Sequence, residues 1–322
     1  MEIVKKIAKW LGILLLVLVT AFLLIGLIPV PNDGYPSSPE PMGSYEASAS
    51  RVNAILEEEM PITNETSRSI FFDTGERTDE VYVLIHGLTN APKEFAELGG
   101  LLHDRGHNVI ILRMPYHGLK GLDIKELDPL TADDIRTYAD EVVDIAAGLG
   151  ENITVIGISG GGAAAAWIAQ NRPEVQRVVL LNPFFGLAQM PMFLDPIIMN
   201  ALLRLPDLSI SREPKPNRHW LYSGESGNGA AVFMSLGQSV LEKAKMEPPE
   251  VLEMLILTSA SDLAVDNDWA DRLATEWQDQ GARVQTYEFA KDLDIPHASI
   301  DPFTAAQKRQ LVYDQIFAWL NE

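Results

Sequence analysis

Short apolar segments rich in β-branched residues alternate with segments of helical periodicity along most of the chain. The apolar segments predict strands at residues 70–72, 81–85, 109–112, 153–156, 175–181, 254–257 and 284–289. Helical spacing of apolar positions predicts helices at residues 47–60, 91–103, 131–147, 163–169, 267–280 and 305–320. This alternation predicts an α/β fold, with a mostly parallel, doubly wound sheet covered by helices on both faces.

The alternation breaks between about residues 186 and 249. A methionine-rich apolar stretch is followed by a proline-punctuated polar stretch and a predicted helix. We interpret residues 186–249 as a helical cap inserted into a core of residues 47–185 and 250–322. The apolar stretch includes Met190, Met192 and Phe193, which we consider as substrate-binding residues because flexible thioethers adapt to acyl chains of varied shape. Simple packing of the cap onto the core is the alternative for each of them.

The N-terminal segment has the pattern of a membrane helix. Residues 10–30 carry no charge and are long enough to span a bilayer. Lysines precede this segment and acidic residues follow it, which predicts a cytoplasmic N-terminus and a periplasmic or extracellular remainder. We therefore interpret residues 1–30 as a single-pass membrane anchor and the Pro/Gly/Ser-rich residues 31–46 as a linker. A cleaved signal peptide, which would give a secreted protein, is the alternative.

Composition narrows the classes of partner and chemistry. The 322 residues include 45 acidic and 25 basic side chains, for a net charge of −20, which disfavours nucleic acid as a partner. The absence of cysteine excludes disulfides, a cysteine nucleophile and thiolate metal sites. The histidines do not follow a recognised metal-binding pattern, so we predict no metal and no cofactor.

A G-x-S-x-G motif at residues 157–161 is the strongest chemical signal in the chain. It follows a predicted strand and precedes a predicted helix, which is the context that a nucleophilic serine on a sharp turn requires. Gly157 and Gly161 lack Cβ atoms and allow strand and helix to approach closely. We predict that Ser159 is a nucleophile; a serine that only caps the helix is the alternative.

A serine nucleophile needs a base and an acid. Of six histidines, only His219 and His297 follow Ser159, and folds built around this turn place serine, acid and histidine in that order. His219 falls in the predicted cap, whereas His297 lies on a loop after the last strand, so we predict His297 as the base. The first carboxylate after residues 254–257 is Asp262, our predicted acid, with Asp266 as the alternative.

Two backbone N–H groups complete the predicted site. The Gly160 N–H lies at a helix N-terminus, which favours negative charge. The second oxyanion donor should come from the loop after an early strand, and we predict the Leu88 N–H. His86, two residues earlier, is predicted to orient that turn.

These motifs resemble the α/β-hydrolase superfamily, most closely its bacterial carboxylesterase and monoacylglycerol-lipase branch. The resemblance covers residues 69–320, with a tyrosine at Tyr116 and a proline at Pro296 where the branch usually has glycine. The matching segments are His86-Gly87-Leu88-Thr89, Arg113-Met114-Pro115-Tyr116-His117-Gly118, Gly157-Ile158-Ser159-Gly160-Gly161, Ser261-Asp262 and Pro296-His297. The membrane segment is not part of the family pattern.

The resemblance implies an α/β-hydrolase fold and a serine hydrolase of carboxylic esters, acting through an acyl-enzyme on Ser159. The expected partners are a small-molecule ester or lipid, such as a monoacylglycerol or lysolipid, and a membrane contacted by the N-terminal helix. Acyltransferase, thioesterase or serine peptidase activity with the same triad remains an alternative. A non-catalytic binding protein that keeps the fold is a further alternative.

Overall fold

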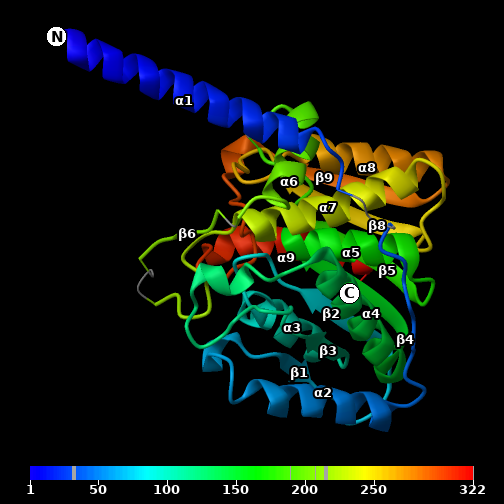
Figure 1. Cartoon of the computed structure of the whole chain (residues 1–322). Helices are drawn as coiled ribbons and strands as arrows, with labels where there is room; N and C mark the ends of the chain where they lie inside the picture. The colour runs from blue at the N-terminus through cyan, green and yellow to red at the C-terminus, as the bar shows by residue number, and fades with distance from the viewer. Residues whose placement is uncertain (31–33, 189, 207, 214–216, 322) are drawn as a thin grey trace.

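The computed structural model describes residues 1–30, 34–188, 190–206, 208–213 and 217–321 (Figure 1). Residues 31–33 of the predicted linker, and residues 189, 207 and 214–216 of the predicted cap, therefore lie outside the described residues, as does residue 322. Figure 1 shows a sheet covered by helices, and a long N-terminal helix that projects away from it.

The core is a seven-stranded sheet with the order β1-β3-β2-β4-β5-β8-β9. β1 pairs antiparallel with β3, and the other neighbouring pairs of this sheet are parallel, which confirms the predicted mostly parallel sheet. In the register, Val155 of the central strand pairs with Val83 on one side and Val178 on the other. The strands are β1 (Ile70–Phe72), β2 (Thr78–Ile85), β3 (Asn108–Ile111), β4 (Gly150–Ile158), β5 (Val175–Leu181), β8 (Glu253–Ser259) and β9 (Arg283–Phe289).

Helices pack on both faces of this sheet, as predicted. Successive strand residues point to opposite faces, so Val155 joins a core with α4, α5, α7 and α8, whereas Ile156 joins a core with α3 and α9. The helices are α2 (Tyr45–Glu59), α3 (Ala96–His103), α4 (Ala132–Leu149), α5 (Gly160–Asn171), α7 (Gly227–Ala244), α8 (Asn267–Asp279) and α9 (Ala306–Leu320).

The inserted segment divides into two parts with different surroundings. α7 packs against α5, and its residues Phe233 and Leu236 are fully buried in the main core. Before α7 come the short helices η4 (Met192–Leu194) and α6 (Asp195–Leu202), and a two-stranded sheet of β6 (Ile210–Ser211) and β7 (Gly224–Glu225). The α7 part of the predicted cap is thus built into the helical layer of the core.

Residues 34–42, part of the predicted linker, are fixed along the surface of the core, and we call this segment the strap. Tyr35 is 8% exposed, and its carbonyl oxygen accepts a hydrogen bond from the Trp167 indole N–H at 2.8 Å. Its hydroxyl lies 2.8 Å from Ser235 Oγ. The linker prediction therefore needs correction for these residues, because the Pro/Gly/Ser composition that is typical of a linker also suits an extended segment bound to a surface.

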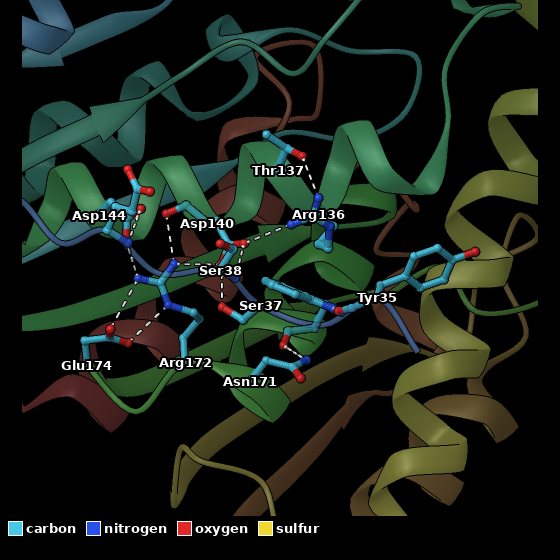
Figure 2. A network of polar contacts seen from close by, with 12 residues as sticks. Tyr35, Ser37, Ser38, Arg136, Thr137, Asp140, Asp144, Asn171, Arg172 and Glu174 are labelled. Carbon is cyan, nitrogen blue, oxygen red and sulfur yellow. Dashed lines mark hydrogen bonds and ion pairs between the residues drawn. The ribbon is translucent and has the colours of Figure 1, made fainter. Parts of the chain in front are cut away.

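The strap is held by two carboxylates of α4 (Figure 2). Asp140 accepts hydrogen bonds from Ser37 Oγ at 2.6 Å and from the Ser38 N–H at 2.9 Å. Asp144 accepts a bond from the Glu40 N–H at 3.0 Å. Both carboxylates are also bonded to Arg172, so the strap closes a charged network.

The Arg172 guanidinium is fully buried at the end of α5. It donates to Asp140 at 2.9 Å, to Asp144 at 2.5 Å and to Glu174 at 3.1 Å. A buried cation of this kind is tolerated when its donors all meet acceptors. Its position at the C-terminal end of a helix is also favourable, since the helix dipole is negative there.

The N-terminal helix α1 (Glu2–Gly26) is long and apolar enough to cross a membrane, and its most apolar window is not buried inside the protein. Both a membrane anchor and a signal sequence have these properties. The helix begins earlier than the uncharged segment, because Glu2 and the lysines before Trp10 also favour helix.

Candidate active site

Ser159 lies on the sharp turn between β4 and α5, as predicted. Its backbone has φ 56° and ψ −119°, a conformation that residues other than glycine rarely adopt. A Cβ on Gly157 would overlap the Gly161 backbone, and a Cβ on Gly161 would overlap the Ile85 carbonyl. Both glycines are therefore required for the close approach of strand and helix at the strained serine.

Ser159, His297 and Asp262 form one hydrogen-bonded chain. His297 Nε2 lies 2.8 Å from Ser159 Oγ, and His297 Nδ1 lies 2.6 Å from Asp262 Oδ2. The Asp262 side chain is fully buried, whereas the His297 side chain is 25% exposed. The three residues thus have the geometry of a Ser-His-Asp triad.

The Asp262 carboxylate is oriented by its own loop. Its second oxygen, Oδ1, accepts hydrogen bonds from the Ala264 N–H at 2.8 Å and the Val265 N–H at 3.3 Å. This leaves Oδ2 for the imidazole. The alternative acid, Asp266, instead caps α8 by accepting a bond from the Asp268 N–H at 3.1 Å.

Asn182, which was not among the residues predicted from the sequence, supports the loop that carries His297. Its Nδ2 donates to the His297 carbonyl at 2.9 Å, and its backbone has φ 41°. Asparagine is among the few residues that tolerate this left-handed conformation. An asparagine directly after the strand that ends at Leu181 was the available signal.

The turn after β2 lies directly against Ser159. A Cβ on Gly87 would lie 3.4 Å from Ser159 Cβ, and both Gly87 and Leu88 line the cavity at the serine. The His86 Nε2 accepts a bond from the Met114 N–H at 3.1 Å, so its Nδ1–H donates to the Gly87 carbonyl at 2.9 Å. Burial lowers the pKa of His86 well below its usual value, which keeps it neutral. His86 thus holds the turn.

Two further side chains fix the same turn. The Glu94 carboxyl accepts a bond from the Gly87 N–H at 2.8 Å, and burial raises the pKa of Glu94 to about 8. His117 Nε2 lies 2.7 Å from the Leu88 carbonyl oxygen, and burial lowers the pKa of His117 to about 4. The peptide that carries the Leu88 N–H is therefore held from both sides.

Gly160 is the first residue of α5, where a backbone N–H has no acceptor within its own helix. The positive end of the helix dipole lies at this position. The predicted donors, Gly160 and Leu88, thus flank Ser159 on α5 and on the turn after β2. This arrangement suits the stabilisation of a negatively charged oxygen near Ser159.

A cavity of about 570 Å³ opens at Ser159 and His297. This volume is within the usual range for small-molecule sites, roughly 300–1,000 Å³. Its wall is largely apolar, with Leu88, Ile158, Phe184, Leu221, Val265 and Phe303 among the lining residues. A polar part of the wall is formed by Asn90, Glu94 and Asp301, with Asn90 Nδ2 donating to Asp301 Oδ2 at 3.0 Å.

Met190, Met192 and Phe193 do not line this cavity, which corrects their predicted role. Phe193 is 73% exposed and Met190 is 40% exposed, while Met192 packs against the main core. The apolar wall comes instead from residues of the core, such as Leu88, Ile158 and Phe184, and from Leu221. Among the residues that the structure describes, no cluster of three or more His, Asp or Glu side chains is arranged to hold a metal ion.

The profile of the α/β hydrolase family matches residues 82–312. The chain therefore belongs to the α/β hydrolase family, as its motifs predicted. A comparison with curated proteins gives no significant match.

Solved structures with the same fold include several lipolytic enzymes. A monoacylglycerol lipase from Paleococcus ferrophilus is 18% identical, with a TM-score of 0.59, and the match covers 79% of this chain and 98% of that one. A soluble variant of monoglyceride lipase from Saccharomyces cerevisiae is 15% identical, with a TM-score of 0.58, covering 79% and 91%. A structure reported for LipS and LipT, two metagenome-derived lipolytic enzymes, is 16% identical, with a TM-score of 0.58, covering 80% of this chain and 99% of that one. At these identities the likeness establishes the shared fold.

Proposed function

We propose that this protein is a membrane-anchored serine hydrolase that cleaves carboxylic esters. The observation that carries the proposal is the hydrogen-bonded chain from Ser159 through His297 to Asp262, on a strained turn that faces an apolar cavity. A helix-capping serine would need none of these features, and Ser159 makes no side-chain capping bond to α5.

The reaction follows from the positions of the three side chains. Ser159 Oγ attacks the ester carbonyl carbon, and its proton passes to His297 Nε2. Asp262, bonded to Nδ1, stabilises the imidazolium that forms. The tetrahedral intermediate then expels the alcohol, which takes the proton from His297, and leaves an acyl-enzyme on Ser159. Water, deprotonated by His297, then attacks the acyl carbonyl carbon. Ser159 Oγ leaves and takes the proton back from His297, which releases the carboxylic acid and restores the triad.

The negative oxygen of the tetrahedral intermediate would be stabilised by the Leu88 and Gly160 N–H groups. Mutational loss of one such donor costs about 3–4 kcal/mol in a well-studied protease. The donors here belong to the backbone, so His86, Glu94 and His117 control them by fixing the turn. These three residues are positioning residues for the oxyanion site.

The substrate class is an ester with an apolar acyl chain, such as a monoacylglycerol or lysolipid. The apolar wall of the cavity supports this, as does the N-terminal helix, which would keep the protein beside lipid. We place the N-terminus in the cytoplasm and the catalytic domain on the periplasmic or extracellular side, because Lys5, Lys6 and Lys9 precede the apolar segment.

The test is turnover of p-nitrophenyl esters of increasing acyl length by the full chain in detergent micelles. We expect hydrolysis with a preference for medium or long chains, and fluorophosphonate labelling of Ser159. Ser159→Ala should lose both, whereas Ser239→Ala, on the far part of α7, should keep both. Turnover that survives Ser159→Ala would disprove the proposal.

The acceptor of the acyl group is a separate question, because the same triad serves acyl transfer, thioester cleavage and peptide cleavage. Product analysis with added glycerol, thiol or amine acceptors decides it. Free fatty acid as the main product at all acceptor concentrations is the expected result. A new ester or amide as the main product would assign the protein to the acyltransferases instead.

A further inference from the structure

One face of α6 is directed to the end of the membrane helix. η4 runs directly into α6, so Phe193, Ile197, Asn200 and Arg204 are spaced at four, three and four residues. Residues at this spacing lie on the same face of a helix. Ile197, Asn200 and Arg204 all contact residues 26–30, where α1 ends.

Asn200 and Arg204 satisfy the polar groups that α1 leaves open at its end. Asn200 Nδ2 donates to the Gly26 carbonyl at 3.0 Å, and its Oδ1 accepts from the Val30 N–H at 3.0 Å. Arg204 donates to the carbonyl oxygens of Ile28 at 2.7 Å and Pro29 at 2.6 Å. The last carbonyl groups of a helix have no donor within that helix. Asn200 supplies a donor to the Gly26 carbonyl, and Arg204, two residues after α6, binds the two carbonyl groups that follow the end of α1.

The end of α1 also lies very close to α6. A Cβ on Gly26 would overlap the Ile197 carbonyl, so only glycine fits at this contact. Asn200 is 7% exposed, which shows that the contact is built into the fold. The end of α1 and the helix α6 are therefore one structural unit.

The contacts between α6 and the end of α1 indicate where the exposed residues of η4 lie. Ile197 meets Gly26, Asn200 meets both Gly26 and Val30, and Arg204 meets residues 28–29, so Ile197 lies nearest to the helical part of α1. Phe193, in η4, precedes Ile197 on this face by about one helical turn, roughly 5 Å. Phe193 is 73% exposed and Met190 is 40% exposed. In Figure 1, α1 leaves the molecule beside α6.

We propose that η4 and the first turn of α6, with Phe193 and Met190 as the apolar side chains, insert into the boundary between lipid headgroups and acyl chains. This inference rests on the proposed membrane span of α1. Phenylalanine side chains on the apolar face of interfacial helices are buried at this boundary, and a short apolar turn beside a membrane helix lies close to the bilayer that the helix crosses. The bilayer is thus the partner that covers this otherwise exposed surface.

The same helix is bonded to the loop that carries the catalytic acid. Asp195, at the start of α6, accepts a bond from the Trp269 indole N–H at 2.7 Å and from the Leu187 N–H at 3.3 Å. Leu187 in turn pairs with Val265, which lines the cavity and donates its N–H to Asp262. Insertion of η4 would therefore hold one wall of the cavity near the lipid surface.

The cysteine-free sequence allows a direct test of depth. Single variants Phe193→Cys, Leu16→Cys and Met60→Cys are made in the full chain, labelled with an environment-sensitive fluorophore and reconstituted in phosphatidylcholine vesicles that contain quencher-bearing lipids. Leu16 lies within α1, and Met60, 51% exposed at the end of α2, is the matched surface control. We expect strong quenching at positions 16 and 193 and little at position 60.

A second variant tests the contact with α1. Asn200→Ala combined with Arg204→Ala should reduce quenching at position 193 and leave quenching at position 16 unchanged, with fluorophosphonate labelling retained as evidence of folding. Quenching at position 16 with none at position 193 overturns the inference and leaves the proposed esterase function and the membrane span intact. No quenching at position 16 overturns the span and the inference together.

Discussion

The two ends of α5 carry the two most contrasting polar networks of the molecule. At its N-terminal end, Ser159 has a strained backbone, and its hydroxyl faces a cavity. At its C-terminal end, Arg172 is fully buried among three carboxylates and covered by the strap (Figure 2). Both networks join charged or polar side chains through short hydrogen bonds. Reactivity differs because the first network leaves one oxygen open to a ligand, whereas the second satisfies its donors.

The contrast teaches how one helix serves two purposes. In the proposed reaction the positive end of the helix dipole would stabilise the oxyanion, and the negative end favours the Arg172 guanidinium. A mutation at the first end should therefore remove activity with little change in stability. A mutation at the second end should do the reverse.

The largest effect is expected from Asp262→Asn. The amide preserves the shape of the side chain but presents an N–H to His297 Nδ1, which selects the wrong tautomer of the imidazole. We expect kcat to fall by roughly 10⁴-fold, as in the corresponding substitution of a serine protease triad. The free energy of unfolding should change less than in Arg172→Met, because the amide oxygen can still accept the Ala264 and Val265 N–H bonds. Ester turnover and denaturant unfolding, measured on the same sample, check the predicted changes in activity and in stability. A large loss of stability would contradict the separation of catalytic and structural roles between the two networks.

Arg172→Met tests the other end of the helix. It leaves Asp140 and Asp144 without their buried cation, which typically costs about 3–5 kcal/mol. Turnover per active site, counted by fluorophosphonate labelling, should remain close to that of the parent chain. Arg212→Met is the matched control, because its ion pair with Glu225 is mostly exposed and should contribute less than about 1 kcal/mol. Equal effects of the two substitutions would contradict the structural role of Arg172.

Glu94 extends the comparison to a carboxyl without a cationic partner. This buried group accepts a hydrogen bond from a backbone N–H, whereas the Asp140 and Asp144 carboxylates are paired with a guanidinium. Burial raises the pKa of Glu94 to about 8 in the folded state, compared with about 4.5 for a solvated glutamate in the unfolded chain. Between these values the unfolded chain releases the proton that the folded chain keeps, so stability falls as pH rises. The fall is at most about 4 kcal/mol between pH 5 and pH 8. The free energy of unfolding of Glu94→Gln should fall less between pH 5 and pH 8. A pH dependence equal to that of the parent chain would contradict the raised pKa of Glu94.

The smallest effect is expected from Asn182→Gly. Glycine tolerates the positive φ but removes the donor to the His297 carbonyl. Loss of one such bond, about 1 kcal/mol, should lower kcat by about tenfold or less. KM should stay nearly constant, since Asn182 does not line the cavity. A higher KM with an unchanged kcat would show that Asn182 acts on substrate binding instead.

The sequence was most informative where one conformation is chemically required. The glycines around Ser159 allow a single close approach of strand and helix, and strand order brings the loops of Asp262 and His297 to the same edge of the sheet. Both could be predicted from spacing. The Asn182 contact could not, because one asparagine after a strand has several compatible roles.

The strap and the methionine-rich segment were harder to predict for a related reason. The composition of residues 34–42 fits a free linker as well as an extended segment, and only the position of Trp167 and the α4 carboxylates decides between them. Likewise, exposed apolar residues such as Phe193 have the same pattern whether they face a cavity, the core or lipid. These choices depend on contacts between segments far apart in the sequence.

The hydrogen bond from Trp167 to the Tyr35 carbonyl has a practical consequence for anyone preparing a detergent-free version of the catalytic domain. Truncation at residue 45, the first residue of α2, would strip the indole of its acceptor and open a hydrophobic slot beside α5. Truncation at Gly34 would keep the Tyr35 carbonyl as acceptor and leave the slot beside α5 covered. The shorter form should aggregate on size-exclusion chromatography, and the longer one should elute as a defined species.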